Sequence, residues 1–255
     1  MLAIVSATRE EIAAIADSLT NVTAQEFGRR RYHVGRLCGT EVVAVFSRWG
    51  KVAAAATATH VVTSCAATEV IFTGVAGAID PALAIGDIVV GTELMQHDMD
   101  ATPMFPRYEI PLLGKARIPT DPGLCARLTV AAQEFLRQDL TSTVPASELA
   151  VFDISSPKVR NGLIASGDKF FASAEEIAAV RQRLPDALCV EMEGAAVAQV
   201  CDEYGVPFGI VRTISDTADH NSVHDFPRFS REIAGHYSAG ILSRFVSRHS
   251  LERPA

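Results

Sequence analysis

Carboxylate side chains stand directly after three of the strands that the sequence predicts. They are Glu10 and Glu11 after the first strand, Glu191 and Glu193 after a later one, and Asp216 after the last. Carboxyl groups can give a proton to a bound molecule or take one from it, and two of them in different surroundings can do both. Because the carboxyl ends of parallel strands meet at one edge of a sheet, we expect these groups to converge on one ligand site.

Each acidic group, taken alone, also fits a purely structural role. A glutamate in the first turn of a helix, such as Glu11 or Glu193, interacts favourably with the helix dipole. Ser215 and Asp216 can equally form a helix cap or an Asx turn. It is the convergence of all three features on one end of the sheet that favours a chemical role.

Alternating strand and helix patterns position these groups. The expected strands cover residues 1–7, about 25–37, 41–46, 70–73, 87–90 with an extension to 94, 159–166, 187–190 and 207–214. The expected helices cover residues 10–19, 51–65, 122–137, 173–183, 193–204 and 227–249. Strands that alternate with helices predict an α/β fold with a mostly parallel sheet wrapped by helices.

The connecting segments have compositions of their own. The segment GVAGAID, residues 74–80, is expected to form a glycine-bearing turn after its strand. Residues 99–120 are rich in Pro and Gly and predict an extended loop, and residues 138–157 show no clear pattern. The basic cluster Arg29 to Arg31 is expected at a solvated hairpin turn.

Composition excludes several classes of function. The chain has 255 residues, of which 48% are hydrophobic and 21% charged, so it can bury a large core. Its mean hydropathy of +0.19 is typical of strands covered on both faces. The net charge of −7 argues against nucleic acid as a partner, because nucleic-acid-binding domains present clustered Lys and Arg.

The cysteines and the apolar stretches indicate a cytoplasmic protein. The five cysteines are scattered and include no CxxC pair, which favours neither a disulfide framework nor a zinc site. The N-terminal residues lack the basic start and long apolar core of a signal peptide. The uncharged stretch 52–68 predicts a buried Ala-rich helix rather than a membrane span, so no membrane partner is expected.

Five segments, in order and spacing, resemble the 5′-methylthioadenosine/S-adenosylhomocysteine nucleosidases of the nucleoside phosphorylase superfamily. The two most specific are VEMEGAAVAQVC at 190–201 and VPFGIVRTISDTAD at 206–219. The others are SATREEI at 6–12, FTGVAGAIDPALAIGDIVV at 72–90 and GLIASGDKFF at 162–171. The resemblance implies one domain over residues 1–255, a three-layer α/β/α fold with a central mixed, largely parallel, twisted sheet. It also implies hydrolysis of a purine nucleoside and a place in methionine salvage.

The resemblance implies an acid and a base on opposite sides of the ribose. Asp216 matches the family's acid, which protonates N7 of the departing adenine, and Ser215 would orient it. Burial could raise the pKa of an aspartate from its free value of about 3.9 and so keep a proton available. Glu11 matches the base that activates the attacking water, and Arg212 would help to hold that water. This arrangement parallels that of an inverting glycosidase.

Further matches concern recognition of the ribose and the base. Glu193 matches the carboxylate that binds the ribose hydroxyls, Met192 matches an apolar contact to the sugar, and Glu191 would lie nearby. Phe170 matches the aromatic residue that stacks on the base, and Phe171 matches the residue whose backbone reads the adenine edge. Plain core packing is the alternative for both phenylalanines.

Several positions depart from the family pattern around the sugar. Thr8 stands where Met is common, Trp49 occupies a small aliphatic position, Val75 replaces a serine, and Ala78 replaces the last glycine of TGSAGG, whose Gly77 is kept. In the family these positions border the water site and the ribose or 5′ pocket. The departures bear on substrate preference and leave the acid and the base in place.

No cofactor or metal is expected. His97 and Asp98 resemble a metal pair, but two ligands do not make a site, and the family needs no metal. A purine nucleoside is the expected small-molecule partner, and family habit suggests a homodimer. A loop of the neighbouring subunit would close the 5′ pocket; its residues here are Met104, Phe105, Arg107 and Tyr108.

Three other functions stay open. A nucleoside phosphorylase would need cations around a phosphate, whereas SATREE places carboxylates there and Phe72 stands where such enzymes use Arg; Arg9 and Arg48 are the available cations. A futalosine hydrolase would share the chemistry and differ in the 5′ group. A non-catalytic nucleoside-binding relative is disfavoured because Glu11, Glu193 and Asp216 are all retained.

Overall fold

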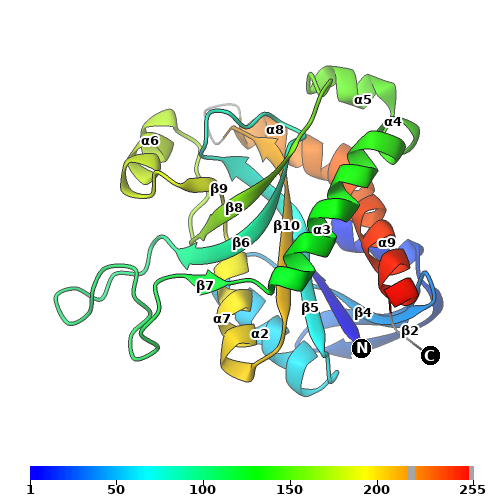
Figure 1. Cartoon of the computed structure of the whole chain (residues 1–255), viewed down its shortest axis with the longest axis horizontal. Coiled ribbons are helices and arrows are strands. Elements are labelled where there is room, and N and C mark those ends of the chain that lie inside the picture. The colour runs from blue at the N-terminus through cyan, green and yellow to red at the C-terminus, as the bar shows by residue number, and fades with distance from the viewer. Residues whose placement is uncertain (218–221, 253–255) are drawn as a thin grey trace.

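One twisted sheet runs through the part of the chain that the structure, a computed structural model, describes: residues 1–217 and 222–252 (Figure 1). Its strands are β1 Leu2–Ser6, β2 Thr20–Phe27, β3 Arg30–Leu37, β4 Thr40–Phe46, β5 Glu69–Ala78, β6 Ile88–Gln96, β7 Ile118–Pro119, β8 Val159–Ser166, β9 Ala187–Glu191 and β10 Phe208–Asp216. The sheet is mixed. Strands β4, β1, β5 and β10 run parallel, as do β6, β8 and β9, whereas β10–β6 and β2–β3–β4 are antiparallel.

Strand β5 closes part of this sheet on itself. It pairs with β1 and β10 along its length, and its last two residues, Gly77 and Ala78, pair with Val190 and Cys189 of β9. Along the sheet, β10 is hydrogen-bonded to β6, β6 to β8, and β8 to β9. Together with β5, which pairs with both β10 and β9, these strands form a closed ring. The C-terminal ends of β5 and β9 therefore meet.

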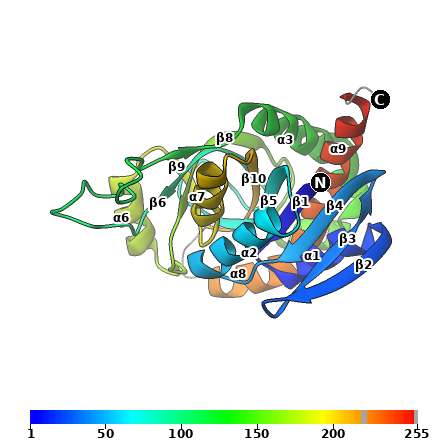
Figure 2. The same cartoon turned by 90° about the horizontal axis from the view of Figure 1, so that it is seen from below.

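Helices cover both faces of the sheet, which confirms the three-layer α/β/α expectation. The helices are α1 Arg9–Asp17, α2 Lys51–Thr63, α3 Pro122–Glu134, α4 Leu140–Thr143, α5 Ala146–Val151, α6 Ala174–Arg183, α7 Gly194–Tyr204, α8 Ser222–Phe229 and α9 Gly235–Glu252, with π-helical turns η1 Phe135–Asp139 and η2 Ser230–Ala234. Helices α1, α3 and α9 pack together on one face, and α2 packs on α7 on the other. Figure 2 shows the β4–β3–β2 edge at the end opposite the loop that leaves β6.

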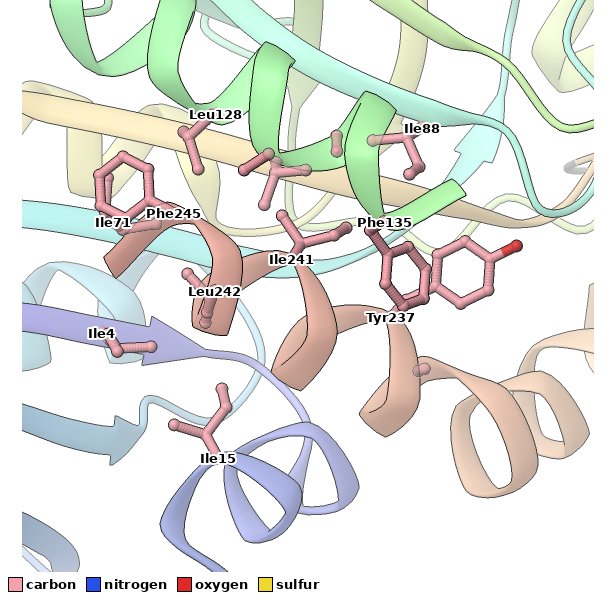
Figure 3. Close-up of a cluster of buried hydrophobic side chains, with 14 of the residues drawn as sticks. Ile4, Ile15, Ile71, Ile88, Leu128, Phe135, Tyr237, Ile241, Leu242 and Phe245 are labelled. Atoms are coloured by element: carbon pink, nitrogen blue, oxygen red, sulfur yellow. The ribbon is translucent and has the colours of Figure 1, made fainter. Parts of the chain in front are cut away.

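Large aliphatic and aromatic side chains fill the face covered by α1, α3 and α9 (Figure 3). Phe135 and Tyr237 meet edge to face with ring centroids 5.0 Å apart. Gly240 of α9 faces the Phe135 ring so closely that a Cβ there would lie 2.4 Å from it. Interiors are packed as densely as organic crystals, so this contact fixes how α9 lies on the sheet and on α3.

Small side chains let α2 and α7 approach the other face. Ala54, Ala58 and Val61 of α2 are fully buried, as is Ala195 of α7. The uncharged stretch at residues 52–68 is thus a packed helix followed by a turn. Among residues 1–217 and 222–252, no helix is long and apolar enough to cross a membrane.

One expectation about the connecting segments is wrong, and one segment without a sequence pattern is now defined. Residues 74–78 form no turn but continue β5, because Gly74 and Gly77 keep extended backbone. At Gly74 the missing side chain allows a close approach, because a Cβ there would lie 3.2 Å from Nη1 of Arg212. The unpatterned stretch 138–157 contains the short helices α4 and α5, too short to show a helical period in sequence.

The last two elements also differ from expectation. Asp216 is the last residue of β10 rather than a residue after it. The final helix was expected to begin at residue 227, since Pro suits a first helical turn. Pro227 instead lies inside α8, which begins at Ser222, and the π-helical turn η2 joins α8 to α9.

Candidate active site

A cavity opens where the C-terminal ends of β1, β5, β9 and β10 meet. It holds about 520 Å³ of empty space, part of it open to solvent, which is within the usual range of ligand pockets. Its walls are Ala7, Thr8, Glu11, Trp49, Gly74, Val75, Ala76, Gly77, Phe170, Val190, Glu191, Met192, Glu193, Arg212, Ser215, Asp216 and Phe226. We call it the central cavity. Of the residues expected from sequence to act on or contact the nucleoside, Phe171 and Ala78 are not among these walls, and Glu10, expected to converge with the other carboxylates, lines a neighbouring cavity instead.

Glu11 is held by the turn between β1 and α1. Thr8 caps α1, and its hydroxyl accepts a hydrogen bond from the backbone N–H of Glu11. The Ser6 hydroxyl donates a hydrogen bond to Oε2 of Glu11. The side chain is completely buried, and among the described residues its Oε1 atom has no hydrogen-bond partner. A buried acceptor without a partner is costly, so Oε1 is placed to receive a bond from a water molecule or a ligand.

Burial dominates the acidity of Glu11. Desolvation raises its pKa above the ordinary value, and the bonds from Ser6 and Thr8 and the charge of Arg212 oppose that rise. A glutamate in this state takes up a proton more readily than one in water. It is therefore suited to accept a proton from a bound water.

Arg212 belongs to an ion pair inside the cavity wall. Its Nη2 atom lies 2.7 Å from Oε2 of Glu191, both side chains are almost fully buried, and its guanidinium lies 4.1 Å from the centroid of the Phe72 ring. Glu191 also accepts hydrogen bonds from the Ser166 hydroxyl and from the backbone N–H of Gly194, at the start of α7. Glu191 is therefore a structural anchor, and it partly neutralises Arg212, the one Lys or Arg that the described residues contribute to the walls of the central cavity.

Glu193 is bound by the turn that begins α2. Its Oε1 atom accepts a hydrogen bond of 2.8 Å from the backbone N–H of Gly50, a residue with φ of +90°, where glycine is favoured. Burial and the neighbouring charge of Glu191 raise the pKa of Glu193 to about 8, although the Gly50 bond acts in the opposite direction. The other oxygen of this carboxylate is not bonded by Gly50.

A group of charged side chains connects this turn to the loop after β8. Nζ of Lys51 lies 2.6 Å from Oδ1 of Asp98, and the backbone N–H of Lys51 donates to Oδ1 of Asp168 at 2.8 Å. The Asp168 N–H in turn donates to Oδ2 of Asp98 at 2.9 Å. We call Lys51, Asp98 and Asp168 the clasp. It joins the Gly50–Glu193 contact to the loop that carries Phe170.

Asp216 reaches the cavity from the end of β10. A register irregularity between Ile214 and Asp216 alters the pairing with β5 at this point. The Asp216 side chain is buried, and the Ser215 hydroxyl donates to its Oδ2 atom at 2.8 Å. The last two residues of the predicted motif 206–219, Ala218 and Asp219, lie outside the described residues.

The two phenylalanines lie in different surroundings. Phe170 is 41% exposed and lines the central cavity, where its ring meets Phe226 edge on at 5.7 Å. Phe171 is buried in the core beneath α6, and it lines a smaller adjoining cavity of about 270 Å³. Lys169 also lines that cavity. The cavity shares with the central one the residues Gly77, Phe170, Val190, Glu191, Met192 and Asp216.

Several functional contacts have no local sequence signal. Phe226 lies in α8 and faces both Trp49, at 5.6 Å, and Phe170, yet nothing in its surroundings in sequence marks it. The bond from Gly50 to Glu193 joins residues 143 positions apart. The role of Ser6 could have been inferred from the sequence, because Ser6 ends the strand that precedes Glu11 and both residues belong to the segment SATREEI.

His97 and Asp98 do not act together. Asp98 belongs to the clasp, and its pKa lies below the ordinary value because the bonds from Lys51 and Asp168 outweigh its burial. The His97 ring packs 5.4 Å from that of Phe171, and burial lowers the pKa of His97. Across residues 1–217 and 222–252, no cluster of three or more His, Cys, Asp or Glu side chains could hold a metal ion.

The arrangement can perform proton transfers on an elongated ligand. Four carboxylates line the central cavity, from Glu11, Glu191, Glu193 and Asp216, against one guanidinium that is already paired. Aromatic rings from Phe170, Phe226 and Trp49 stand at the more exposed wall. Such a cavity suits a flat, uncharged base joined to a hydroxyl-bearing group.

Comparison with protein families gives a match over almost the whole chain. The family model described as the phosphorylase superfamily matches residues 1–247. The 5′-methylthioadenosine/S-adenosylhomocysteine nucleosidase of Anoxybacillus flavithermus is 37% identical over 237 residues, which are 93% of this chain and 94% of the relative. The protein of the same name from Shewanella putrefaciens is 34% identical, with the same coverage of both chains.

Solved structures agree with the sequence comparisons. The nucleosidase of the same name from Neisseria meningitidis, solved with methylthio-immucillin-A, superposes with a TM-score of 0.83 at 33% identity, covering 97% of this chain and 98% of the other. A futalosine hydrolase from Helicobacter pylori superposes with a TM-score of 0.82 at 31% identity, covering 97% of each chain. The backbone alone does not separate these two activities.

Proposed function

The chain belongs to the 5′-methylthioadenosine/S-adenosylhomocysteine nucleosidases of the phosphorylase superfamily, and from that premise we propose that it hydrolyses the N-glycosidic bond of one or both of these nucleosides. The products are adenine and the 5-thio-substituted ribose. The observation that carries this proposal is the charge of the central cavity. Among the described residues that line it, the one guanidinium is already paired with Glu191, so the walls offer no free cation to hold a phosphate nucleophile, whereas water needs none.

Two carboxyl groups carry the proposed proton transfers. Asp216, oriented by Ser215, protonates N7 of the purine as the glycosidic bond breaks, so that adenine leaves as a neutral molecule. Glu11 accepts a proton from water, which attacks the anomeric carbon from the opposite face of the ribose. The buried and unpartnered Oε1 atom of Glu11 supports this assignment, because it offers an acceptor to that water.

The remaining wall residues hold the substrate. Glu193 receives hydrogen bonds from the ribose hydroxyls, and Met192 packs against the sugar. Phe170 stacks on the base, and the backbone at Phe171 reads its edge from the smaller cavity. Thr8, Trp49, Val75 and Gly77 border the sugar and its 5′ substituent, while Arg212 acts near the water through its charge.

We also propose that the protein is a cytoplasmic homodimer that serves methionine salvage. Its five cysteines are free thiols, which suits a reducing compartment. The loop between β6 and β7 projects away from the body of its own chain (Figures 1 and 2), and Met104 in this loop is 84% exposed. Phe105 and Tyr108 on this loop line neither cavity of their own chain, which supports a role in closing the 5′ pocket of a second copy.

Product analysis tests the hydrolysis. We expect purified protein to release adenine and a reducing sugar from 5′-methylthioadenosine at the same rate with and without phosphate. Turnover that requires phosphate and yields a sugar 1-phosphate would make the protein a phosphorylase. Tight binding of the nucleoside without turnover would make it a non-catalytic relative.

A further inference from the structure

A third cavity adjoins the central one on the side of α8. It holds about 850 Å³ of empty space, again partly open to solvent, and we call it the outer cavity. Its walls are Thr8, Arg9, Glu10, Phe46, Trp49, Phe226, Pro227, Ser230 and Arg231. Thr8, Trp49 and Phe226 also line the central cavity, so one ligand can extend from one space into the other.

The charge of the outer cavity is opposite to that of the central cavity. Two guanidinium groups and one carboxylate line it, although the whole chain carries a net charge of −7. Arg9 lies in the first turn of α1, where the helix dipole disfavours a cation. A cation in the first turn lowers the stability of the helix, so a role in binding a ligand would explain why an arginine stands there.

Both arginines are available to a ligand. The Arg9 guanidinium lies 5.4 Å from the centroid of the Phe46 ring, and none of the ion pairs found within residues 1–217 and 222–252 involves Arg9. Arg231 pairs with Glu232 at 2.7 Å, but its side chain is 64% exposed. An exposed pair of neighbouring residues contributes little free energy, so a ligand carboxylate can replace it.

The arrangement of the three cavities indicates which of them the purine occupies and which the 5′ substituent occupies. The smaller cavity, beside Phe171 and Asp216, lies at one side of the central cavity, and the outer cavity shares a different wall, made by Thr8, Trp49 and Phe226. With the purine at the first side and the ribose on Glu193, as under the proposed function, the 5′ carbon faces the outer cavity. A methylthio group ends at the shared wall, whereas a longer substituent enters the outer cavity.

We propose that the outer cavity is a subsite for a carboxylate at the end of the 5′ substituent, bound by Arg9 and Arg231. The inference rests on the proposed function and adds the class of 5′ group that the site prefers. Guanidinium groups bind carboxylates through directional, charge-assisted hydrogen bonds. The apolar surface of Phe46 and Trp49 packs against the chain that leads to the carboxylate, whether that chain is aliphatic or aromatic.

The test compares substrates that differ only in the tail. We would measure kcat/KM for 5′-methylthioadenosine, S-adenosylhomocysteine, the decarboxylated 5′-(3-aminopropylthio) analogue and a 5′-(3-carboxybenzylthio) analogue. The proteins would be the wild type, R9M, R231M and the double variant. R36M is the matched control, because Arg36 is an exposed arginine on β3 that bonds to the backbone of Gly39, away from the cavity.

We expect each single variant to lower kcat/KM for S-adenosylhomocysteine about tenfold, the effect of losing about 1.4 kcal/mol of charge-assisted bonding. Turnover of 5′-methylthioadenosine and of the decarboxylated analogue should change less than about twofold, and R36M should act as wild type. A loss for the carboxybenzyl substrate as well assigns the site to carboxylates in general, and a loss for S-adenosylhomocysteine alone assigns it to amino-acid tails.

Two outcomes would overturn the subsite. One is a double variant that turns over all four substrates as the wild type does, and the other is an equal loss with and without the carboxylate. Failure of the proposed function looks different, because wild-type protein would then release adenine from none of the substrates.

Discussion

At the scale of single residues, burial in the central cavity raises the pKa values of two carboxyl groups, those of Glu11 and Glu193. Glu193 is 5% exposed and lies beside Glu191, whose charge is held by Arg212 and by the amides at the start of α7. Desolvation by burial is the first cause of the raised pKa values of Glu11 and Glu193. The charge of Glu191 adds to the rise at Glu193, and the charge of Arg212 opposes the rise at both.

The raised pKa of Glu193 makes the stability of the folded protein depend on pH. Its pKa is about 8 in the folded protein and near the ordinary 4.5 in the unfolded chain. Between these values the folded state holds a proton that the unfolded state has lost, so stability falls as pH rises, by at most about 1.4 kcal/mol per pH unit. Below pH 4.5 both states are protonated and the penalty is absent.

Glu193→Gln should therefore be more stable than wild type at pH 8 and similar to it at pH 4.5. A Gln side chain keeps the acceptor for Gly50 and removes the titration. The free energy of unfolding by urea, measured across this pH range, checks the expectation, with the exposed Glu10→Gln as control. A stability difference between E193Q and wild type that does not change with pH would contradict it.

Asp216 gives the second prediction at this scale. Asp216→Asn keeps the acceptor for the Ser215 hydroxyl and removes the transferable proton. We expect kcat to fall on the order of 10²–10⁴-fold, the usual contribution of a general acid, while affinity for adenine changes only a few-fold. Steady-state kinetics and calorimetry of adenine binding would measure the two effects. Wild-type turnover by D216N would exclude Asp216 as the acid, whereas S215A, which only loosens the orientation, should lose less.

At the scale of elements, the clasp connects three parts of the chain that lie far apart in sequence. Lys51 begins α2, Asp98 follows β6, and Asp168 follows β8. Lys51 is next to Gly50, which binds Glu193, and Asp168 is two residues from Phe170. The clasp therefore sets the separation between the ribose contact and the ring that faces the base.

Breaking the clasp should affect binding more than chemistry. We expect Lys51→Met and Asp98→Asn each to raise KM for 5′-methylthioadenosine about tenfold and to change kcat less, because Glu11 and Asp216 are held by other elements. The double variant should be little worse than either single one, since both remove the same contact. Lys115→Met, which breaks a pair of similar length with Asp202 at 2.7 Å, is the control. Additive losses, or a change confined to kcat, would contradict a positioning role.

At the scale of the whole molecule, apolar side chains are exposed on Trp49, which lines the central cavity, and on the helices α2 and α8. They include Trp49 at 55% exposed, Val52 at 82% on α2, and Val223 at 54% on α8. Contiguous exposed apolar residues next to a binding site commonly mark a protein interface. Together with the projecting loop, they support the proposal of a homodimer whose interface includes α2 and α8.

Val52→Glu should then convert the protein into a monomer. One chain has a mass of 27.3 kDa, so light scattering after size exclusion should give about twice this mass for wild type and this mass for the variant. Turnover should fall with dissociation, because the loop of the second copy no longer closes the 5′ pocket. Val151→Glu, at a residue 49% exposed on α5, is the matched control. A dimeric V52E protein would place the interface elsewhere.

The sequence by itself determined the order of the elements and the residue types at the strand ends. The apolar period predicted β8 at residues 159–166 as it is found, and the five ordered segments identified nearly all residues that line the central cavity. These features are local, since a strand or a first helical turn is set by residues within a few positions. They failed where a local signal has two uses: the glycines at 74 and 77 were expected in a turn, but both lie in β5, and Gly74 allows Arg212 to approach that strand.

Only the tertiary structure decided which partner each charged group takes. Arg212 pairs with Glu191 rather than Glu11, Gly50 binds Glu193, and Asp98 binds Lys51 rather than acting with His97. Phe226, absent from every sequence motif, closes the aromatic wall, and Arg9 faces the outer cavity. These contacts join distant residues, and their strength depends on burial, which raises the cost of an unpaired charge far above its cost in water. Burial is a property of the folded chain, so no local pattern contains it.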